Sequence, residues 1–212
     1  MTTKERIVSE ALTLFSRKGY KGTSVKDIAA AVGVKDSSLY KHFKSKQDIL
    51  DAIMATIKDH IQRITESFGL PTGTDYDGAA AFYATLTQDD LVALSNKIFL
   101  FYLKDDLLSK FWRMGSMEQF HNPQVYALFR RFFLEDSIQY QAALFSEMIR
   151  HHIFIAADPE VMAVSFYTPI FFLLSKYAGL ESDEAEALAA LDKQVREFYR
   201  VYKAPPAASM PI

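Results

Sequence analysis

A short polar segment, residues 33–46, holds the side chains of this chain that are best suited to binding chemistry. Its sequence is GVKDSSLYKHFKSK, in which Leu39 and Phe43 are the only two large aliphatic or phenyl side chains. Because these two are four residues apart, a helix places them on one face. The outward face then carries groups that can hydrogen-bond to phosphates or to base edges, namely Ser37, Ser38, Tyr40, Lys41 and His42. The alternative reading is that Tyr40 packs on a neighbour and that His42 is an ordinary surface histidine.

The charge of the chain is unevenly distributed along its 212 residues. Residues 1–46 hold ten Lys/Arg and four Asp/Glu, a formal charge of +6, whereas the remainder holds fourteen and twenty-two, a formal charge of −8. A basic N-terminal part on an acidic body is typical of a protein that binds a polyanion through one end only. The alternative is a basic face that is simply solvated.

The residues before the polar segment predict the elements that must position it. Apolar periodicity indicates a helix over 3–18, and a second helix begins at a capping box formed by Ser24 and Asp27 and ends at Gly33. A third, short helix over 36–43 follows, so that residues 24–43 form a helix-turn-helix. The second helix of such a motif enters the major groove of DNA. Thr23 and Ser24, at the start of the second helix, and Lys46, at the start of a fourth, are placed to meet phosphates.

Residues 15–46 resemble the DNA-binding domain of the TetR family of transcriptional regulators. The resemblance rests on many positions in one register, over about the first quarter of the chain: Phe15 with Gly19-Tyr20, Thr23-Ser24-Val25 with Asp27-Ile28-Ala29, Gly33-Val34, Leu39-Tyr40-Lys41-His42-Phe43 and Lys44-Ser45-Lys46. It implies an all-α homodimer in which each subunit has a three-helix DNA-binding head and a helical regulatory body.

The resemblance also implies which residues touch DNA. Tyr40, His42 and Lys46 match family positions that contact phosphates. Lys35, Ser37, Ser38 and Lys41 match positions that contact phosphates or bases. Two residues depart from the commoner pattern, since Ser37 stands where glycine is frequent and Asp36 where a basic residue is frequent. We interpret Asp36 as a helix cap, because an acid beside DNA weakens phosphate attraction.

Helical periodicity continues through the rest of the chain, and no strand pattern or internal repeat stands out. We predict a head over 1–46, a regulatory body over 47–204 and a disordered tail over 205–212. The clearest loop is 69–78. After a long helix that begins at Ser45 and Asp48, the helices of the body are predicted over 79–86, 88–113, 123–153, 159–179 and 184–203.

The resemblance implies that the body binds a small effector and that its last two helices form the dimer interface. For the interface we select apolar positions of these helices, Val161, Phe172, Leu188, Leu191, Val195 and Phe198. The alternative is that they form ordinary monomer core. Eighteen of the 29 aromatic residues lie between residues 98 and 177, which suits an apolar or aromatic effector. Our pocket candidates flank a helix break expected at Gly115 and the Asn122-Pro123 junction, although an aromatic stripe is more commonly core: Phe101, Phe111, Trp112, Phe120, His121, Tyr126 and Phe129.

Other functional classes have little support in the sequence. There is no cysteine, no phosphate-binding glycine loop and no nucleophile elbow. His151 and His152 are adjacent, so a helix points them about 100° apart, and Asp105-Asp106 is read as a solvated charge pair. We therefore predict no catalytic residue, no metal site and no cofactor. The N-terminus lacks the apolar run of a secretory signal, and the apolar stretch 161–180 is broken by polar residues and Pro169, which favours a cytoplasmic protein without a membrane span.

The sequence thus predicts an all-α regulator that binds a palindromic double-stranded operator as a homodimer and responds to a small effector. A ligand-responsive repressor is the leading hypothesis. An activator is an open alternative. So is a helical enzyme or carrier that kept the head and lost DNA binding.

Overall fold

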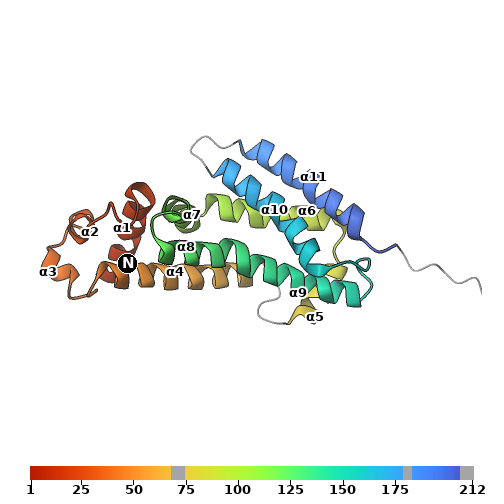
Figure 1. The fold of residues 1–212 in the computed structure, drawn as a ribbon, viewed down its shortest axis with the longest axis horizontal. Helices are drawn as coiled ribbons and strands as arrows, with labels where there is room; N and C mark the ends of the chain where they lie inside the picture. The colour runs from red at the N-terminus through yellow and green to blue at the C-terminus, as the bar shows by residue number, and fades with distance from the viewer. Residues whose placement is uncertain (68–74, 179–182, 206–212) are drawn as a thin grey trace, which may run out of the picture. The chain divides into compact units, whose positions relative to one another are not determined.

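The computed structural model describes residues 1–67, 75–178 and 183–205 (Figure 1). The described residues are helical, with one isolated β-bridge between Phe154 and Lys203. The elements are α1 (Thr3–Lys18), α2 (Val25–Val32), α3 (Asp36–Leu39), α4 (Lys46–Ser67), α5 (Tyr76–Ala84), α6 (Gln88–Lys104), α7 (Asp106–Glu118), α8 (Pro123–Arg130), the π-helix η1 (Arg131–Glu135), α9 (Asp136–Arg150), α10 (Pro159–Tyr177) and α11 (Glu184–Tyr202). The all-α fold class is confirmed. Among these helices, none is both long and apolar enough to cross a membrane.

Two compact units make up the chain. The first comprises Met1–Gly69 and Lys104–Phe132, and the second comprises Leu70–Leu103 and Phe133–Ile212. The head predicted over 1–46 therefore lies in the same unit as α4, α7 and α8. The boundary at residue 46 separates a DNA-binding head from a regulatory body by function, and this boundary stays a prediction.

In the first unit, α1 packs against α2, α4 and α7. Thr2 forms a capping box with Glu5 at the start of α1, and the predicted box of Ser24 with Asp27 begins α2. Before α4, the Asp48 N–H donates to Ser45 Oγ at 3.0 Å. The apolar faces expected from periodicity are buried between these helices, among them Ile7, Ala11, Phe15, Ile28, Leu39, Ile49 and Ile53. Three short helices followed by a long one are therefore confirmed.

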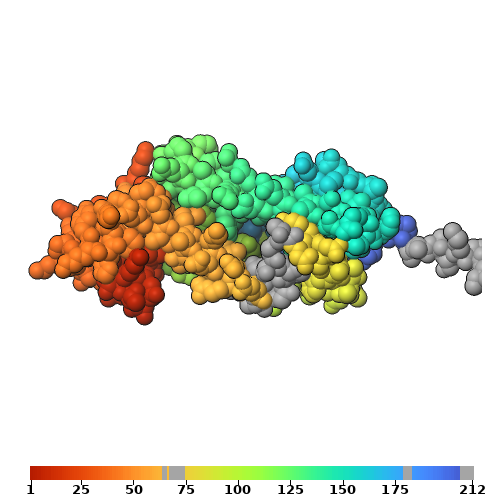
Figure 2. Space-filling model, turned by 90° about the horizontal axis from the view of Figure 1, so that it is seen from below, coloured from red at the N-terminus to blue at the C-terminus, as the bar shows by residue number. Residues whose placement is uncertain are grey.

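In the second unit, α10 packs between α9 and α11, and α5 packs on α9. Figure 2 shows α5, in yellow, against the blue-green end of α9. The core of this unit is aromatic: Phe198 stacks on Phe145 with ring centroids 5.3 Å apart and meets the Phe166 ring at 4.9 Å. Leu191, Val195 and Phe198 are all buried here.

Several predicted element boundaries were wrong. The helix predicted over 88–113 is two helices, because Asp105 caps α7 by accepting a hydrogen bond from Leu108 N–H at 2.9 Å. Gly115 is no helix break and lies inside α7. The helix predicted over 123–153 contains the π-helical turn η1. The loop prediction over 69–78 fails at its end, where α5 begins at Tyr76. Residues 69–74 and the tail from residue 206 onward lie outside the described residues.

Candidate nucleic-acid interface

The polar segment is held in place by a turn and two apolar anchors. Gly33 ends α2 with φ of 76°, in the left-handed region that favours glycine, and its N–H reaches the carbonyls of the last turn. Three residues later α3 begins. Leu39 and Phe43 are buried as predicted, so the segment is fixed to the first unit from one side.

The α3 helix is shorter than the sequence suggested. Only residues 36–39 are α-helical, and the chain then turns through His42, whose N–H donates to the Leu39 carbonyl at 2.9 Å. Lys35 occupies the N-cap position without a side-chain hydrogen bond. Our interpretation of Asp36 as the cap was therefore wrong. Asp36 is the first helical residue, where a carboxylate favours the positive end of the helix.

Most of the predicted DNA-contacting side chains lie on the surface. Tyr40 is 53% exposed although it is a large aromatic residue. Ser38 is half-buried, and five others are exposed, namely Ser24, Lys35, Ser37, Lys41 and His42. These residues, together with Tyr40 and Ser38, we call the polar face. Further exposed lysines of this unit lie at positions 18, 21, 26 and 44. Exposed aromatic and hydroxyl side chains in a unit that also exposes several lysines have the composition of a duplex-binding surface.

Thr23 was wrongly predicted to face DNA. Its side chain is fully buried, and its hydroxyl donates to the Gly19 carbonyl at 3.0 Å. The hydroxyl closes the turn between α1 and α2, and the cap of α2 belongs to Ser24 alone. Thr23 and Ser24 are consecutive and chemically alike, and only the packing of the turn separates their roles.

Lys46 also has a place that the sequence did not reveal. Its ammonium donates to the Tyr20 carbonyl at 2.8 Å and to the Thr23 carbonyl at 2.9 Å, and it lies 4.3 Å from the centroid of the Tyr20 ring. Burial lowers the pKa of the Lys46 ammonium, and the Glu118 carboxylate opposes this shift. Lys46 thus braces the α1–α2 turn, and a phosphate contact by the same ammonium stays a prediction.

The pocket candidates do not form one group. Phe111, Trp112 and Phe129 are buried together, with the Trp112 and Phe129 rings 5.4 Å apart, and Tyr126 stacks on Phe129 at 6.2 Å. Gly115 makes this packing possible, since a Cβ there would lie 2.2 Å from Phe129 Cδ2.

Of the other three candidates, two lie on the surface. Phe120 is 85% exposed and His121 is exposed. Neither lines an interior site, so these two predictions were wrong. Phe101 belongs to the second unit. The pocket assignments of Phe101 and of the aromatic group around Phe129 stay predictions.

The dimer candidates divide by helix. On α10, Val161 and Phe172 are 59% and 62% exposed, and Val164 is exposed on the same side of the helix. On α11, Leu191, Val195 and Phe198 are buried inside the second unit, so their assignment to a subunit interface was wrong; Leu188 is half-buried. The apolar stripe of α11 serves the core of its own chain.

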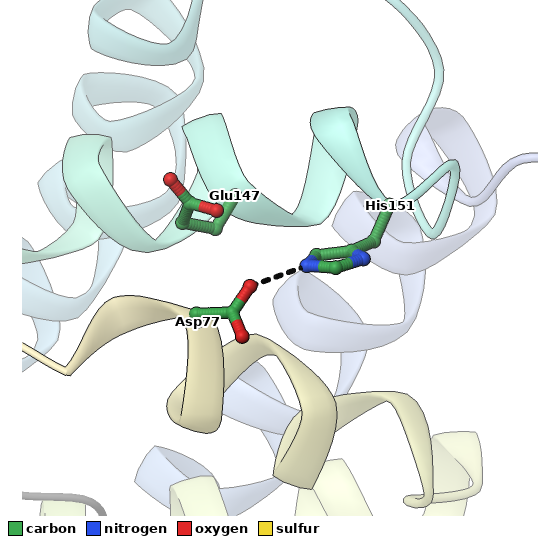
Figure 3. A group of neighbouring side chains, drawn as sticks. All are labelled: Asp77, Glu147 and His151. Atoms are coloured by element: carbon green, nitrogen blue, oxygen red, sulfur yellow. Dashed lines mark hydrogen bonds and ion pairs between the residues drawn. The ribbon is translucent and has the colours of Figure 1, made fainter.

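A cluster of charged residues, which no sequence motif predicted, joins α5 to α9. His151 Nε2 lies 2.7 Å from Asp77 Oδ1, and Glu147 is one helical turn from His151 (Figure 3). The ligand atoms of these three side chains lie within 4.8 Å of one another, a spacing that a metal ion accepts. However, the Arg150 guanidinium forms ion pairs with both Asp77 and Glu147. The arginine supplies the cation that these carboxylates need, and His151 and Arg150 hold the pKa of Asp77 below its usual range.

Comparisons with known proteins agree with the geometry of the first unit. Residues 7–53 match the family described as bacterial regulatory proteins, tetR family. A negative transcriptional regulator of the biofilm operon icaADBC, IcaR of Staphylococcus aureus, is 44% identical over 61 residues, which are 29% of this chain and 33% of IcaR. The chain therefore spans about a third of the length of the curated relatives it matches.

Solved structures extend the likeness to the whole fold. A TetR-family transcriptional regulator from Mesorhizobium loti has a TM-score of 0.68 at 20% identity, over 95% of this chain and 97% of that one. A transcriptional regulator from Saccharomonospora viridis, solved in complex with choline, has a TM-score of 0.62 at 20% identity, over 93% and 95% of the two chains. At such identities the likeness concerns the fold alone.

Proposed function

We propose that this chain, a member of the TetR family of bacterial regulatory proteins, is a transcriptional repressor that binds a palindromic operator as a homodimer and is released by a small-molecule effector. It acts in the cytoplasm, where the chromosomal DNA of a bacterium lies, and it has no catalytic role. The observation that carries the proposal is the polar face, presented by a domain that matches the family over residues 7–53.

The polar face suggests how the head binds duplex DNA. Leu39 and Phe43 hold the segment while Ser37, Tyr40 and Lys41 project from it. A helix and its following turn fit the major groove, which is about 12 Å wide. Two copies in a symmetric dimer reach successive major grooves about 34–36 Å apart, so the operator is a palindrome. The hydroxyls and the lysine supply phosphate contacts and base-edge contacts.

The effector part of the proposal rests on the aromatic packing of α7 and α8. Phe111, Trp112 and Phe129 are buried aromatic side chains of the kind that line sites for small aromatic or apolar molecules. The structural relative from S. viridis was solved with choline bound, and a bound small molecule is compatible with this fold. An effector lowers DNA affinity only if it binds the released conformation more tightly than the bound one.

DNA binding is tested with fluorescence anisotropy on the duplex upstream of the protein's own gene. We expect Lys41→Ala to weaken binding by about tenfold at 0.1 M salt and to reduce the salt slope by about 1, because one phosphate contact is lost. Lys193→Ala is the matched control, since Lys193 is an exposed lysine on α11. Equal loss in both variants, or the absence of any salt-sensitive binding by the parent protein, contradicts the proposal.

The direction of regulation is tested with a reporter fused to the same upstream region. Deletion of the gene raises transcription if the protein is a repressor and lowers it if the protein is an activator. IcaR is a negative regulator, and its similarity to the head favours the first outcome.

A further inference from the structure

Glu118 is the last residue of α7, and its side chain extends into the turn between α1 and α2. It is only 4% exposed, and its Oε1 accepts a hydrogen bond from the Tyr20 N–H at 2.7 Å. The approach is close because position 19 is glycine: a Cβ on Gly19 would lie 2.8 Å from Glu118 Oε1. A carboxylate 98 residues from Tyr20 in sequence therefore accepts a hydrogen bond from the backbone of the DNA-binding domain.

The same residue of the turn is held from the other side by α4. The Tyr20 carbonyl accepts a hydrogen bond from Lys46 Nζ at 2.8 Å, and the Tyr20 ring lies under that ammonium. The N–H and the carbonyl of Tyr20 are thus bound to α7 and to α4 respectively. Glu118 also raises the pKa of the Lys46 ammonium against the effect of burial, so the two charged groups interact across the turn.

This turn sets the position of the polar face. Residues 19–23 link α1 to Ser24, the N-cap of α2, and α2 leads directly through Gly33 to α3. Thr23 locks the end of the turn onto the Gly19 carbonyl. Because Tyr20 and Thr23 in this short turn are both held by hydrogen bonds, we expect a displacement at Tyr20 to reach α2.

The second oxygen of Glu118 makes this contact costly. Oε2 is buried, and no protein group in the part of the chain that the structure describes hydrogen-bonds to it. An unpaired buried acceptor destabilises the folded state, whereas an apolar side chain of similar size at this position carries no such cost. A buried group that is only half satisfied is therefore poorly explained by stability alone, and it is better explained by a requirement for the Tyr20 contact.

We propose that Glu118 is a positioning residue that couples α7 to the helix-turn-helix through the backbone of Tyr20. This inference rests on the proposed function, since it assumes that the polar face binds DNA. The same helix carries Phe111 and Trp112 on its buried side, so an effector that shifts α7 moves the carboxylate and, with it, the α1–α2 turn. The contact is the physical link between the aromatic packing of α7 and the orientation of α2 and α3.

The test uses three substitutions at this position in the full-length protein. Glu118→Gln keeps both the length and an acceptor oxygen, Glu118→Asp keeps the charge and loses one methylene, and Glu118→Ala loses both. Each variant is measured for affinity to the duplex upstream of its own gene and for hydrogen exchange of the Tyr20 amide. The contact with the Tyr20 N–H requires the full length of the glutamate side chain. We therefore expect Glu118→Asp and Glu118→Ala to lose hydrogen-exchange protection of the Tyr20 amide and to bind DNA about 2- to 30-fold more weakly, the usual size of such couplings. We expect Gln to stay close to the parent protein in both measurements.

Met114→Ala is the control for a general loss of stability, because Met114 is fully buried in α7 and is not part of the contact. It should lower the melting temperature and leave the DNA affinity of the folded protein unchanged. The inference is overturned if Glu118→Asp binds DNA as the parent does, or if Met114→Ala weakens binding as much as Glu118→Ala. If the parent protein binds no DNA, the proposed function itself fails, and the inference fails with it.

Discussion

Thr23 and Ser24 have adjacent hydroxyls with different tasks. The Thr23 hydroxyl is buried and donates to the Gly19 carbonyl, whereas Ser24 Oγ accepts from the Asp27 N–H at 3.2 Å and caps α2. Both hydroxyls satisfy backbone groups that the turn and the helix end leave free. Neither role depends on DNA, yet Ser24 remains exposed and able to meet a phosphate as well.

Replacing Thr23 therefore affects stability and leaves DNA contacts intact. We expect Thr23→Val to lower the free energy of unfolding by about 1 kcal/mol, because the shape is kept and one buried hydrogen bond is lost. Thr23→Ser, which keeps the hydroxyl, is the matched control and should lose less. Denaturant unfolding measures the effect. A reduced salt slope of DNA binding in Thr23→Val would instead support the discarded phosphate contact.

At residue 77 the charge cluster predicts a pH effect. His151 and Arg150 lower the pKa of Asp77 in the folded state. A lowered folded-state pKa stabilises the protein at pH values above the unfolded pKa of about 3.9, and this contribution is lost as the pH falls through the folded-state value. The advantage of the parent over Asp77→Asn in melting temperature should thus shrink from about pH 5 to pH 3. The carboxylate is exposed, so 0.5 M salt should reduce the difference; a difference that is constant with pH contradicts the assignment.

Among the elements, α7 departs most from what the sequence suggested, and its ends explain why. Asp105 caps the helix and also lies 2.7 Å from His60 Nε2, so the Asp105-Asp106 pair marks a helix start. At the other end Glu118 contacts the α1–α2 turn. Periodicity identifies which face of a helix is apolar and leaves open which distant element covers it. The capping boxes, the apolar faces and the turn at Gly33 were predictable, because each depends on residues within four positions of one another.

Gly115 was mistaken for a helix break, and its actual role is close packing. We expect Gly115→Ala to destabilise the protein by about 1–3 kcal/mol despite the better helix propensity of alanine, because the new Cβ overlaps the Phe129 ring. The effect should shrink when Phe129 is replaced by leucine in the same chain, and a double-mutant cycle in denaturant measures this coupling.

Gly33→Ala is the comparison for Gly115→Ala. Apart from its chain neighbours, no heavy atom of the described residues lies within 4 Å of a Cβ at position 33, so the cost of about 1–2 kcal/mol comes from the positive φ. That cost should not depend on Phe129. If Gly115→Ala behaves in the same way, the close packing does not explain why position 115 is glycine.

For the whole molecule, sequence similarity to known proteins covers only the first part of the chain, whereas similarity in fold covers nearly all of it. The head was predictable in sequence because its caps, turn and anchors are local. The body was predictable only in its fold class, since its aromatic residues suit a core as well as a pocket. The α11 stripe illustrates this, because the same spacing that suggested a subunit interface fills the core of the second unit. The exposed side of α10 was the informative signal, and exposure is not visible in a sequence.

The last prediction concerns the assembly. Val161, Val164 and Phe172 lie on one side of α10 at spacings of three and eight residues and are all exposed, an arrangement that an isolated chain has no reason to keep. If two subunits meet through this side, Phe172→Glu places a charge in the apolar centre of the interface and should weaken the dimer by about 30- to 1,000-fold, the range of an interface hot spot of 2–4 kcal/mol.

Phe120→Glu is the matched control, because Phe120 is even more exposed and lies in the other unit. Sedimentation velocity over a concentration series distinguishes the two variants. The Phe172→Glu protein should be a folded monomer. This monomer should bind a single half-site more weakly than the parent dimer binds the palindrome. A dimer that survives Phe172→Glu and dissociates in Phe120→Glu would move the interface from α10 to the end of α7.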